Sequence, residues 1–496
     1  MSVYKTVITM KVKNMGRRSR AIFAALAITL FSLPLCYAQK SMEVVFQLPD
    51  TIAPFTIDEF YKVIIEYHPL VRQARLLSES AQQEVRLARG SFDPKAEVQV
   101  DKKEFQNKNY YNKLDAYLSF PTWFPVNPKV GMEHNTGQLL NNSETIPGGK
   151  QLFAGVALPV GRGLITDDRR AAVRQAELFT TIASADQVKI INKVLLQAAK
   201  DYWQWYHAYY SYRLMDRGTR IASEIFRRVK LNLEHGEASQ LDTVQAKITL
   251  QTRLVERQEA LLAFQNSGII LSNYLWNGSY EPVQLSLAVA PVLTAQDTRA
   301  LSLETVQSLT DLAKQNHPEL IKYRTKISQL EIERKLAKEY LKPKLDLNYA
   351  VLSQPSAPHE IDITRDYKFG LDFSMPVFLR KERSKYALSG IKIKNTQLEQ
   401  SQAEREIINE INTTFNQLTN TSSIIAQQTE MVNLYDRLLE AEILNLESGE
   451  SDLFKINLQQ EKLIQAQTKL LKLKSEFEKT KATIYWAAGV RNLNIN

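Results

Sequence analysis

The sequence predicts a mainly α-helical fold with a small β part, duplicated within the chain. Three observations support this fold class. The 496 residues include only 17 glycines and 17 prolines, so few residues interrupt helices. Landmark residues recur in the same order in the two halves of the chain. Segments with period-two alternation lie between the helical stretches, which is typical of strands with unlike faces.

The first 38 residues have the three parts of a secretory signal peptide. A basic segment ends at Arg20, an apolar run covers Ala21 to Leu35, and small residues precede the expected cleavage before Gln39. A transmembrane anchor is the alternative, but the run is shorter than the ~20 residues that span a bilayer. Lipidation of Cys36, the only cysteine, is disfavoured because Leu35 precedes it. We therefore expect an exported chain without cysteine.

Charge and motifs exclude several classes of protein. The formal net charge is +9, and residues 1–38 hold six of the 63 basic residues and no acidic one, so the mature balance is +3. A chain with so small a net positive charge lacks the basic surface that is typical of nucleic-acid-binding proteins. The six histidines form no HExxH motif, and no GxSxG or P-loop occurs. We expect no enzyme, no cofactor and no metal site.

The internal duplication organises the chain. His68-Pro69 recurs as His317-Pro318, and a proline, Pro94 or Pro343, follows 26 positions after each histidine. Later paired landmarks are Leu158-Pro159-Val160 with Met375-Pro376-Val377, Gly236-Glu237 with Gly449-Glu450, and Trp276-Asn277-Gly278 with Trp486-Ala487-Ala488-Gly489. The offset between the halves falls from 249 to 217 positions, so the first half has about 32 extra residues between Pro94 and Pro159. An additional loop or an added hairpin would fit there.

Each repeat is expected to contain a helix, strands, a very long helix, a turn and a second long helix. The first repeat covers residues 39–290, with strands at about 95–160 and long helices at about 164–276. The second covers residues 291–496, with strands at about 344–377 and long helices at about 380–488. Thr56 and Glu59 form a capping-box pattern, and the prolines after His68 and His317 suit a first helical turn. We interpret both histidines as structural residues at helix starts.

The long helices are predicted by the distribution of helix breakers. Between Gly163 and His235 the only glycine is Gly218 and there is no proline, which allows ~70 helical residues, or about 105 Å. Their apolar positions follow spacings of three and four, as in coiled coils. The expected seams are Leu463, Ala466, Leu470, Leu473, Phe477, Thr480 and Ile484 in the last helix and Ile411, Phe415, Leu418, Ser422 and Ile425 in the preceding one.

The predicted strands cannot form a closed structure within one chain. A sheet with one lipid-facing side must close, and membrane barrels begin at about eight strands, so oligomerisation is required. A soluble sheet with ordinary core aromatics is the alternative. Aromatic residues suited to bilayer interfaces occur in the strand regions. They are Tyr117, Trp123, Phe124, Tyr349, Tyr367 and Phe378.

In the order of these landmarks, the sequence resembles the TolC family of outer-membrane efflux channels over roughly residues 55–490. The resemblance implies a homotrimer with a shared transmembrane β-barrel of four strands per protomer, continuing into a long α-helical periplasmic barrel. It implies a location in the outer membrane of a Gram-negative-type bacterium. It also implies an efflux duct that docks with a periplasmic adaptor protein and an inner-membrane transporter. The alternatives are a soluble periplasmic coiled-coil scaffold and an exported enzyme.

The turns between the long helices are expected at the periplasmic tip, where they would seal the resting channel and meet the adaptor. Glycine suits a helix end with positive φ. Acidic residues at the tip would form rings in a trimer that bind or repel cations. The alternative for Asp242 and Asp452 is complementation of the next helix start. The tip residues are Gly236, Glu237, Asp242, Glu447, Gly449, Glu450 and Asp452.

Overall fold

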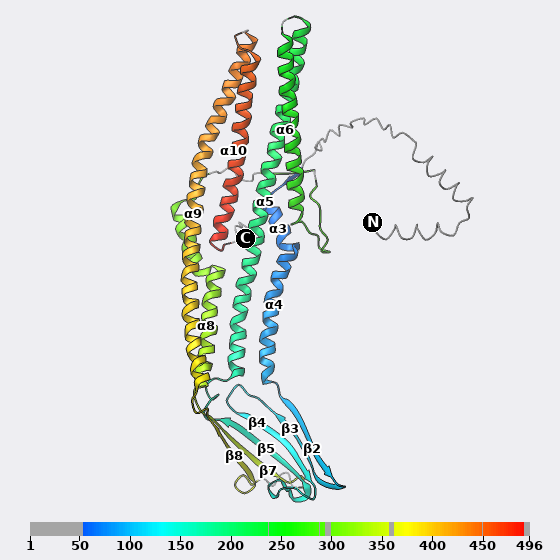
Figure 1. Ribbon diagram of the computed structural model, residues 1–496, viewed down its shortest axis with the longest axis vertical. Coiled ribbons are helices and arrows are strands. Elements are labelled where there is room, and N and C mark those ends of the chain that lie inside the picture. Colours follow the sequence, from blue (N-terminus) through cyan, green and yellow to red (C-terminus); the bar gives the residue numbers. More distant parts are fainter. Residues whose placement is uncertain are drawn as a thin grey trace, which may run out of the picture. The chain divides into compact units, whose positions relative to one another are not determined.

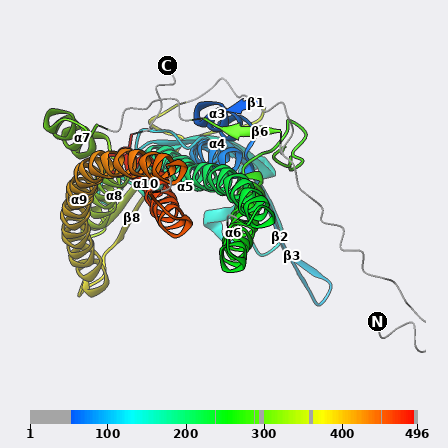
Figure 2. The ribbon, with the colours of Figure 1, turned by 90° about the horizontal axis from the view of Figure 1, so that it is seen from above.

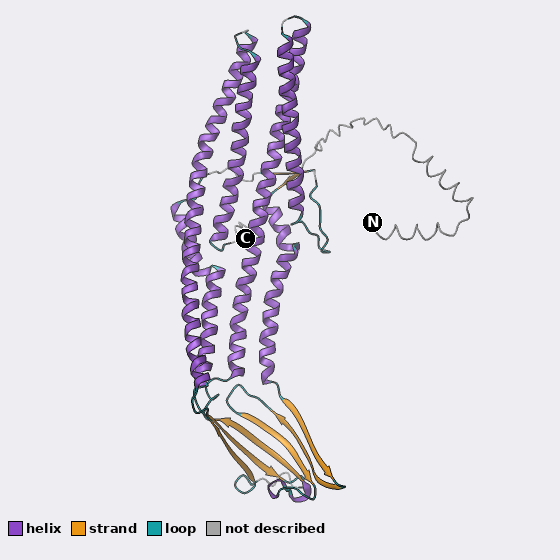
Figure 3. Cartoon of the chain, in the orientation of Figure 1, coloured by secondary structure: helices purple, strands orange, loops and turns teal. Residues whose placement is uncertain are grey.

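The computed structural model describes residues 53–236, 238–286, 288–292, 299–356, 362–448 and 450–490, all in one compact unit. The predicted signal peptide, residues 1–38 with Cys36, lies outside the described residues, as do Glu237 and Gly449. Long helices form most of the unit, and a β-sheet lies at one end (Figures 1 and 3). The predicted fold class, mainly α with a small β part, is therefore confirmed.

The described helices follow the same order in both halves. In the first half they are α3 (Ile57–Tyr67), α4 (Pro69–Arg89), α5 (Asp168–Glu234) and α6 (Gln240–Ser272). In the second half they are α7 (Leu303–Asn316), α8 (Pro318–Glu339), α9 (Arg380–Glu447) and α10 (Leu453–Ala487). Three short 3-10 turns cover Gly90–Phe92, Asn142–Glu144 and Pro147–Gly149.

Side chains cap the first helices of each half. Thr56 and Glu59 form the expected capping box at the start of α3. Nδ1 of His68 accepts a hydrogen bond from the Leu70 amide, and Nδ1 of His317 accepts one from the Glu319 amide, each at 3.2 Å. Both histidines precede a proline in the first helical turn. The structural interpretation of the paired histidines is confirmed.

Helices α5 and α9 contain 67 and 68 residues, so each is about 100 Å long. Helix α5 packs along α6, and α9 packs along α10, while α4 and α8 cover the ends of the long helices near the sheet. Seen from above, the long helices form a curved row in which α10 lies between α9 and α5 (Figure 2). A curved row of this kind forms part of the wall of a wider tube.

The core is divided among the helix pairs. Around the middle of α5, Tyr202 and Trp205 are buried. The Phe60 ring of α3 stacks on Tyr202 at 6.0 Å between centroids, and Phe55 of β1 lies edge-on to Trp205 at 6.4 Å. Between α9 and α10, one cluster centres on Ile411 and Ile484, and the next contains Leu418, Ile425 and Phe477. These are residues of the predicted seams, so the coiled-coil pairing of α9 with α10 is confirmed.

The strands form two sheets. A small parallel pair joins β1 (Ala53–Phe55) to β6 (Val289–Pro291) beside α5. The larger sheet is antiparallel, with the order β2-β3-β4-β5-β7-β8. Its strands are β2 (Lys95–Phe105), β3 (Lys108–Ser119), β4 (Asn127–Thr136), β5 (Lys150–Pro159), β7 (Lys344–Ser353) and β8 (Tyr367–Ser374).

The strand count corrects one expectation drawn from the resemblance. Four strands per protomer were implied, and the structure has six in one sheet. The difference arises in the first half, which gives four strands to this sheet before α5, whereas the second half gives two before α9. Of the two alternatives for the extra segment of the first half, the added hairpin is correct.

Candidate functional site

The six-stranded sheet has one apolar and one polar face. In the register of β2 with β3, Val98 lies opposite Ala116 and Val100 opposite Leu114, while Gln99 lies opposite Asp115 between them. Apolar residues continue on the same face of β4, β5, β7 and β8, while the opposite face is polar at most positions but carries Phe153 and Leu352 where β5 pairs with β7. The apolar face comprises Ala96, Val98, Val100, Leu114, Ala116, Leu118, Val130, Met132, Leu152, Ala154, Val156, Leu158, Leu345, Leu347, Tyr349, Val351, Tyr367, Phe369, Leu371 and Phe373.

No segment among the described residues covers this apolar face. Val98 is 69% exposed at one edge of the sheet, and Phe373 is 66% exposed at the other. Soluble monomers rarely expose so extensive an apolar surface, because its burial from water is favourable by roughly 25 cal/mol per Å². The strands have 8 to 12 residues, close to the 9–11 that cross a bilayer when tilted. The face is therefore suited to contact lipid.

Most of the predicted interfacial aromatics lie near the two ends of the strands. Trp123 and Phe124 belong to the turn between β3 and β4, next to the helices, and Phe378 follows β8 at the same end. Phe124 and Phe378 are 73% and 70% exposed. Tyr349 and Tyr367 stack toward the opposite end of β7 and β8, with centroids 5.8 Å apart. Membrane barrels have aromatic residues at both interfaces, so an interfacial role for these residues stays a prediction.

Tyr117 does not fit this arrangement. It lies opposite Glu97 on the polar face of the sheet, and its hydroxyl donates to Glu97 Oε2 at 2.6 Å. A side chain on that face cannot belong to an outward aromatic girdle. The prediction for Tyr117 is therefore corrected, because period-two alternation decides the face and the sequence position alone does not.

Between β5 and α5, the chain turns over Gly161-Arg162-Gly163. The amide of Arg162 donates to the Pro343 carbonyl at 2.8 Å, which ties this turn to the start of β7. A Cβ atom on Gly161 would lie 2.2 Å from the same oxygen, so only glycine fits. This contact joins landmark residues of the two repeats.

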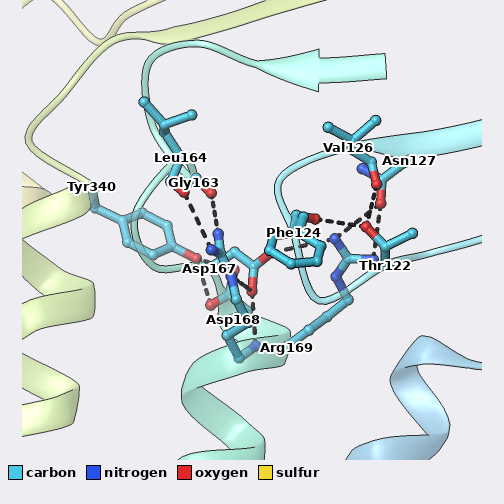
Figure 4. Close-up of polar contacts among 11 residues, drawn as sticks. Thr122, Phe124, Val126, Asn127, Gly163, Leu164, Asp167, Asp168, Arg169 and Tyr340 are labelled. Carbon is cyan, nitrogen blue, oxygen red and sulfur yellow. Dashed lines mark hydrogen bonds and ion pairs between the residues drawn. The ribbon is translucent and has the colours of Figure 1, made fainter. Parts of the chain in front are cut away.

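A polar network fixes the first turn of α5 beneath the sheet (Figure 4). Asp167 caps the helix by accepting from the Arg170 amide at 2.8 Å. The buried guanidinium of Arg170 donates to the carbonyls of Gly163 and Leu164. Arg169 donates to Asn127 Oδ1 at 3.2 Å and so reaches β4. The network holds the helix rigidly to the sheet.

The charge state of Asp167 follows from its neighbours. Burial raises the pKa of this carboxyl, but the amide hydrogen bond from Arg170 and the charges of Arg170 and Arg169 outweigh burial and hold the pKa below its ordinary value. Asp167 is therefore ionised at neutral pH. A cavity of about 500 Å³ opens beside it, lined by residues that include Asp168, Arg169, Asp346 and Asn348.

The tips lie at the end of the long helices opposite the sheet (Figure 1). Helix α5 ends at Glu234, His235 caps it, and Gly236 follows with a φ of 81°. The Gly236 amide donates to the Leu233 carbonyl at 3.1 Å. This is the left-handed termination that was expected there. In the second tip, the Glu450 amide donates to the Asn445 carbonyl at 2.8 Å.

Both tip aspartates take part in capping the helix at their tip, Asp452 as the N-cap of α10 and Asp242 in the first turn of α6 as the partner of the N-cap Ser239. Asp242 accepts from the amide and hydroxyl of Ser239, at 2.9 and 2.8 Å, in a capping box. These hydrogen bonds lower the pKa of Asp242 below its ordinary value. Asp452 accepts from the Lys455 amide at 2.9 Å. The side chain of Glu447, like Glu237 and Gly449, lies outside the described residues. Helix capping at Asp242 and Asp452 is thus established, and a charged ring stays a prediction.

No helix in the described ranges is long and apolar enough to cross a bilayer. Within the same ranges, no cluster of three or more His, Cys, Asp or Glu residues could hold a metal ion.

Sequence reasoning missed several residues that shape this part of the molecule. Gly131 is one, because a Cβ atom there would lie 2.5 Å from both the Ala116 carbonyl and Tyr117 Cβ. Tyr340, which contacts the first residue of α5, is another. Asp167 could have been found, since an aspartate before a long breaker-free stretch is an N-cap signal.

Comparisons with known proteins agree with this geometry. Residues 309–490 match the family of outer membrane efflux proteins. A search of curated protein sequences found no match.

The fold is similar to the CmeC outer membrane channel of Campylobacter jejuni, with 12% identity, 90% of each chain covered and a TM-score of 0.61. It is also similar to VceC of Vibrio cholerae, with 13% identity, 88% and 96% coverage and a TM-score of 0.60. The MtrE channel of Neisseria gonorrhoeae has 10% identity, 89% and 90% coverage and a TM-score of 0.62.

Proposed function

We propose that this chain, an outer membrane efflux protein by the family match of its second half, is one subunit of a trimeric export duct. The observation that carries the proposal is the apolar face shared by all six strands of a sheet whose two edges are open. In lipid, open edges cost several kcal/mol per unpaired backbone group, so the sheet must continue into other copies. Three copies also follow from the resemblance to TolC-family channels.

The helices supply the second part of the duct. With the sheet in the outer membrane, α5 and α9 extend about 100 Å into the periplasm. Their curved row is one part of the tunnel wall (Figure 2). This orientation puts the Gly236 tip and the second tip, near Asp452, farthest from the membrane. We assign the segments 234–242 and 447–454 to docking on a periplasmic adaptor, which links the duct to an inner-membrane transporter.

The soluble periplasmic scaffold is the weaker alternative. It would leave Val98, Phe369 and Phe373 of the apolar face in water, since no described segment covers them. A soluble scaffold would also not need aromatic residues at both ends of its strands, because it has no membrane interfaces for them to contact.

The acidic tip residues add a gating hypothesis that can be separated from helix capping. At Asp452, serine preserves an N-cap acceptor and removes the charge, whereas alanine removes both. A cation-binding ring predicts that Asp452→Ser and Asp452→Ala channels lose cation selectivity to a similar extent in planar bilayers. If only Asp452→Ala changes cation selectivity, the residue acts as a helix cap and the hypothesis of a charged ring is wrong.

A direct test of the function uses a cell that lacks its own export duct. Expression of the chain with its adaptor and transporter should restore efflux of a fluorescent dye. Loss of efflux in Phe369→Asp, which places a charge on the apolar face, supports the membrane role. The matched variant Lys368→Asp changes the neighbouring position on the polar face and should retain efflux. Equal efflux in both variants would contradict the proposal.

A further inference from the structure

The extra segment of the first half has definite boundaries in the structure. Asn127 and Lys344, the first residues of β4 and β7, are 217 positions apart, as are Pro159, the last residue of β5, and Pro376, which lies two positions after β8. Strand β4 is therefore the counterpart of β7, and β5 is the counterpart of β8. The connections agree, since β4–β5 and β7–β8 are each joined by 13 residues, 137–149 and 354–366. The insertion is the hairpin β2–β3 with its following turn, residues 95–126.

This inserted hairpin has the surface of a barrel wall. Its apolar residues continue the apolar face of the sheet, because Leu118 lies opposite Val130 and Ala116 opposite Met132. On the other face, Asp115 lies opposite Glu133 and Lys113 opposite Asn135, so polar residues also continue. A flap folded away from the membrane would not need this alternation along both of its strands.

The hairpin is paired with the sheet over most of its length. Strand β3 pairs with β4 from Asn112 to Ser119, and β2 pairs with β3 from Lys95 to Phe105. The β2–β3 turn contains Gln106 and Asn107, with φ of 50° and 58°, as in the two-residue turns that suit antiparallel hairpins. The inserted strands therefore belong to the same sheet as β4.

The insertion changes which strand forms the edge. Without residues 95–126, β4 and β8 would be the two edges of the sheet, and with them the edges are β2 and β8. Strand β2 runs away from the helices, and β8 runs toward them. The two edges are thus antiparallel in direction, so β8 of one copy can pair with β2 of the next without a reversal of either strand.

We propose that all six strands of each subunit are wall strands, so that three copies close an 18-stranded barrel through a seam between β8 and β2 of the next copy. This inference rests on the proposed function and specifies its subunit contact. The resemblance implied 12 strands. Since barrel diameter grows roughly linearly with strand number, the pore through the membrane is about 1.5 times wider than a 12-stranded one.

Cysteine cross-linking tests the seam directly, because Cys36 is the only cysteine and Cys36→Ala removes it. In that background, one cysteine is placed on the polar face of β8, at Lys368, Gly370 or Asp372. A second is placed on β2, at Glu97, Gln99 or Asp101, or in a parallel series on β4, at Lys129 or Glu133. Oxidation in outer membranes then reports which strand of the next copy lies beside β8.

We expect disulfide-linked dimers and trimers when the two cysteines lie on β8 and β2, and no cross-link when they lie on β8 and β4. Cross-links only between β8 and β4 would overturn the inference and leave the trimeric duct intact. Absence of any cross-link would also overturn the inference. Native mass spectrometry of the same sample then decides whether the trimer itself has failed.

Deletion of residues 95–126 provides a second measurement. It joins Pro94 to Asn127, as Pro343 joins Lys344 in the second half. The shortened protein should form a 12-stranded barrel with roughly half the pore area, since area follows the square of diameter. Polymer exclusion from the extracellular side should show the cutoff radius falling by about one third. An unchanged cutoff in a trimeric deletion variant would place the hairpin outside the barrel wall.

Discussion

Asp168 accepts a hydrogen bond from the Tyr340 hydroxyl, 2.6 Å from Oδ2 and 2.7 Å from Oδ1. Asp168 begins α5 in the first repeat, and Tyr340 caps α8 in the second. The guanidinium of Arg162 lies over the Tyr340 ring, 3.3 Å from its centroid. The Tyr340 side chain thus connects the two repeats where the sheet meets the long helices. Substitution of this residue tests how rigid the connection is.

Tyr340→Phe should weaken this connection without removing the ring. The lost hydrogen bond to a carboxylate contributes about 1 kcal/mol at this partly exposed position. We expect a lower thermal unfolding midpoint, measured by differential scanning fluorimetry in detergent. Tyr386→Phe is a matched control, since its hydroxyl only accepts from Arg334 at 3.2 Å on the surface of α9. Equal midpoints in the two variants would contradict the assignment.

Gly131→Ala should disrupt the sheet. The new Cβ atom would lie 2.5 Å from the Ala116 carbonyl oxygen, far inside normal contact distance, so β3 and β4 must separate. We expect loss of the trimer band in semi-native electrophoresis of outer membranes. The control is Gly370→Ala in β8, where the nearest atom of its own chain would be Asn348 Cβ at 3.6 Å. A stable Gly131→Ala trimer would show that the strands can shift at little cost.

Gly236→Ala should loosen the first tip. Alanine in the left-handed conformation costs about 1 kcal/mol, and the added Cβ atom meets nothing within 4 Å that would compensate. Amide hydrogen exchange in the last turn of α5 should therefore rise about fivefold. Gly268→Ala, in the interior of α6, should leave that exchange unchanged and favour its own helix. Unchanged exchange in Gly236→Ala would contradict the helix termination described for this tip.

His317 should make stability depend on pH. Burial lowers the pKa of this imidazole to about 4, and its neutral Nδ1 accepts the Glu319 amide hydrogen bond. The neutral His317 imidazole contributes fully to folding stability above the pKa of histidine in the unfolded chain, near 6.5. This contribution is lost as pH falls from 6.5 to about 4, because in that range the imidazole binds a proton only in the unfolded chain. The loss is at most about 3 kcal/mol per subunit.

His317→Asn separates titration from capping, since asparagine is a good N-cap without a charge change. The unfolding midpoint of the wild-type protein should fall more steeply between pH 6.5 and 4 than that of the variant. His68 occupies the equivalent position, and burial lowers its pKa too, so some slope should persist in His317→Asn. Identical pH profiles would rule out titration of His317.

Patterns within short stretches of sequence predicted the long helices and the helix starts of this molecule. Breaker-free runs marked α5 and α9, and the capping box marked Thr56 at the start of α3. The duplicated His-Pro landmarks aligned the two halves because the same first-turn chemistry is used twice. These features depend on residues within a few positions of each other, which is the range over which sequence patterns are reliable.

Features that depend on distant residues were not predictable in the same way. The faces of β3 follow from its pairing with β2 and β4, so Tyr117 could not be assigned correctly from position alone. The need for glycine at position 131 arises from the Tyr117 and Phe153 side chains beside it on neighbouring strands. Contact between Asp168 and Tyr340 spans 172 positions of sequence.

The central claim is that three copies form one duct in the outer membrane. Native mass spectrometry of the protein extracted from outer membranes in mild detergent tests it most directly. The account predicts an assembly of three chains, each without its first 38 or so residues. A monomer recovered from the soluble periplasmic fraction would contradict it, because the apolar face of the six-stranded sheet would then be exposed to water.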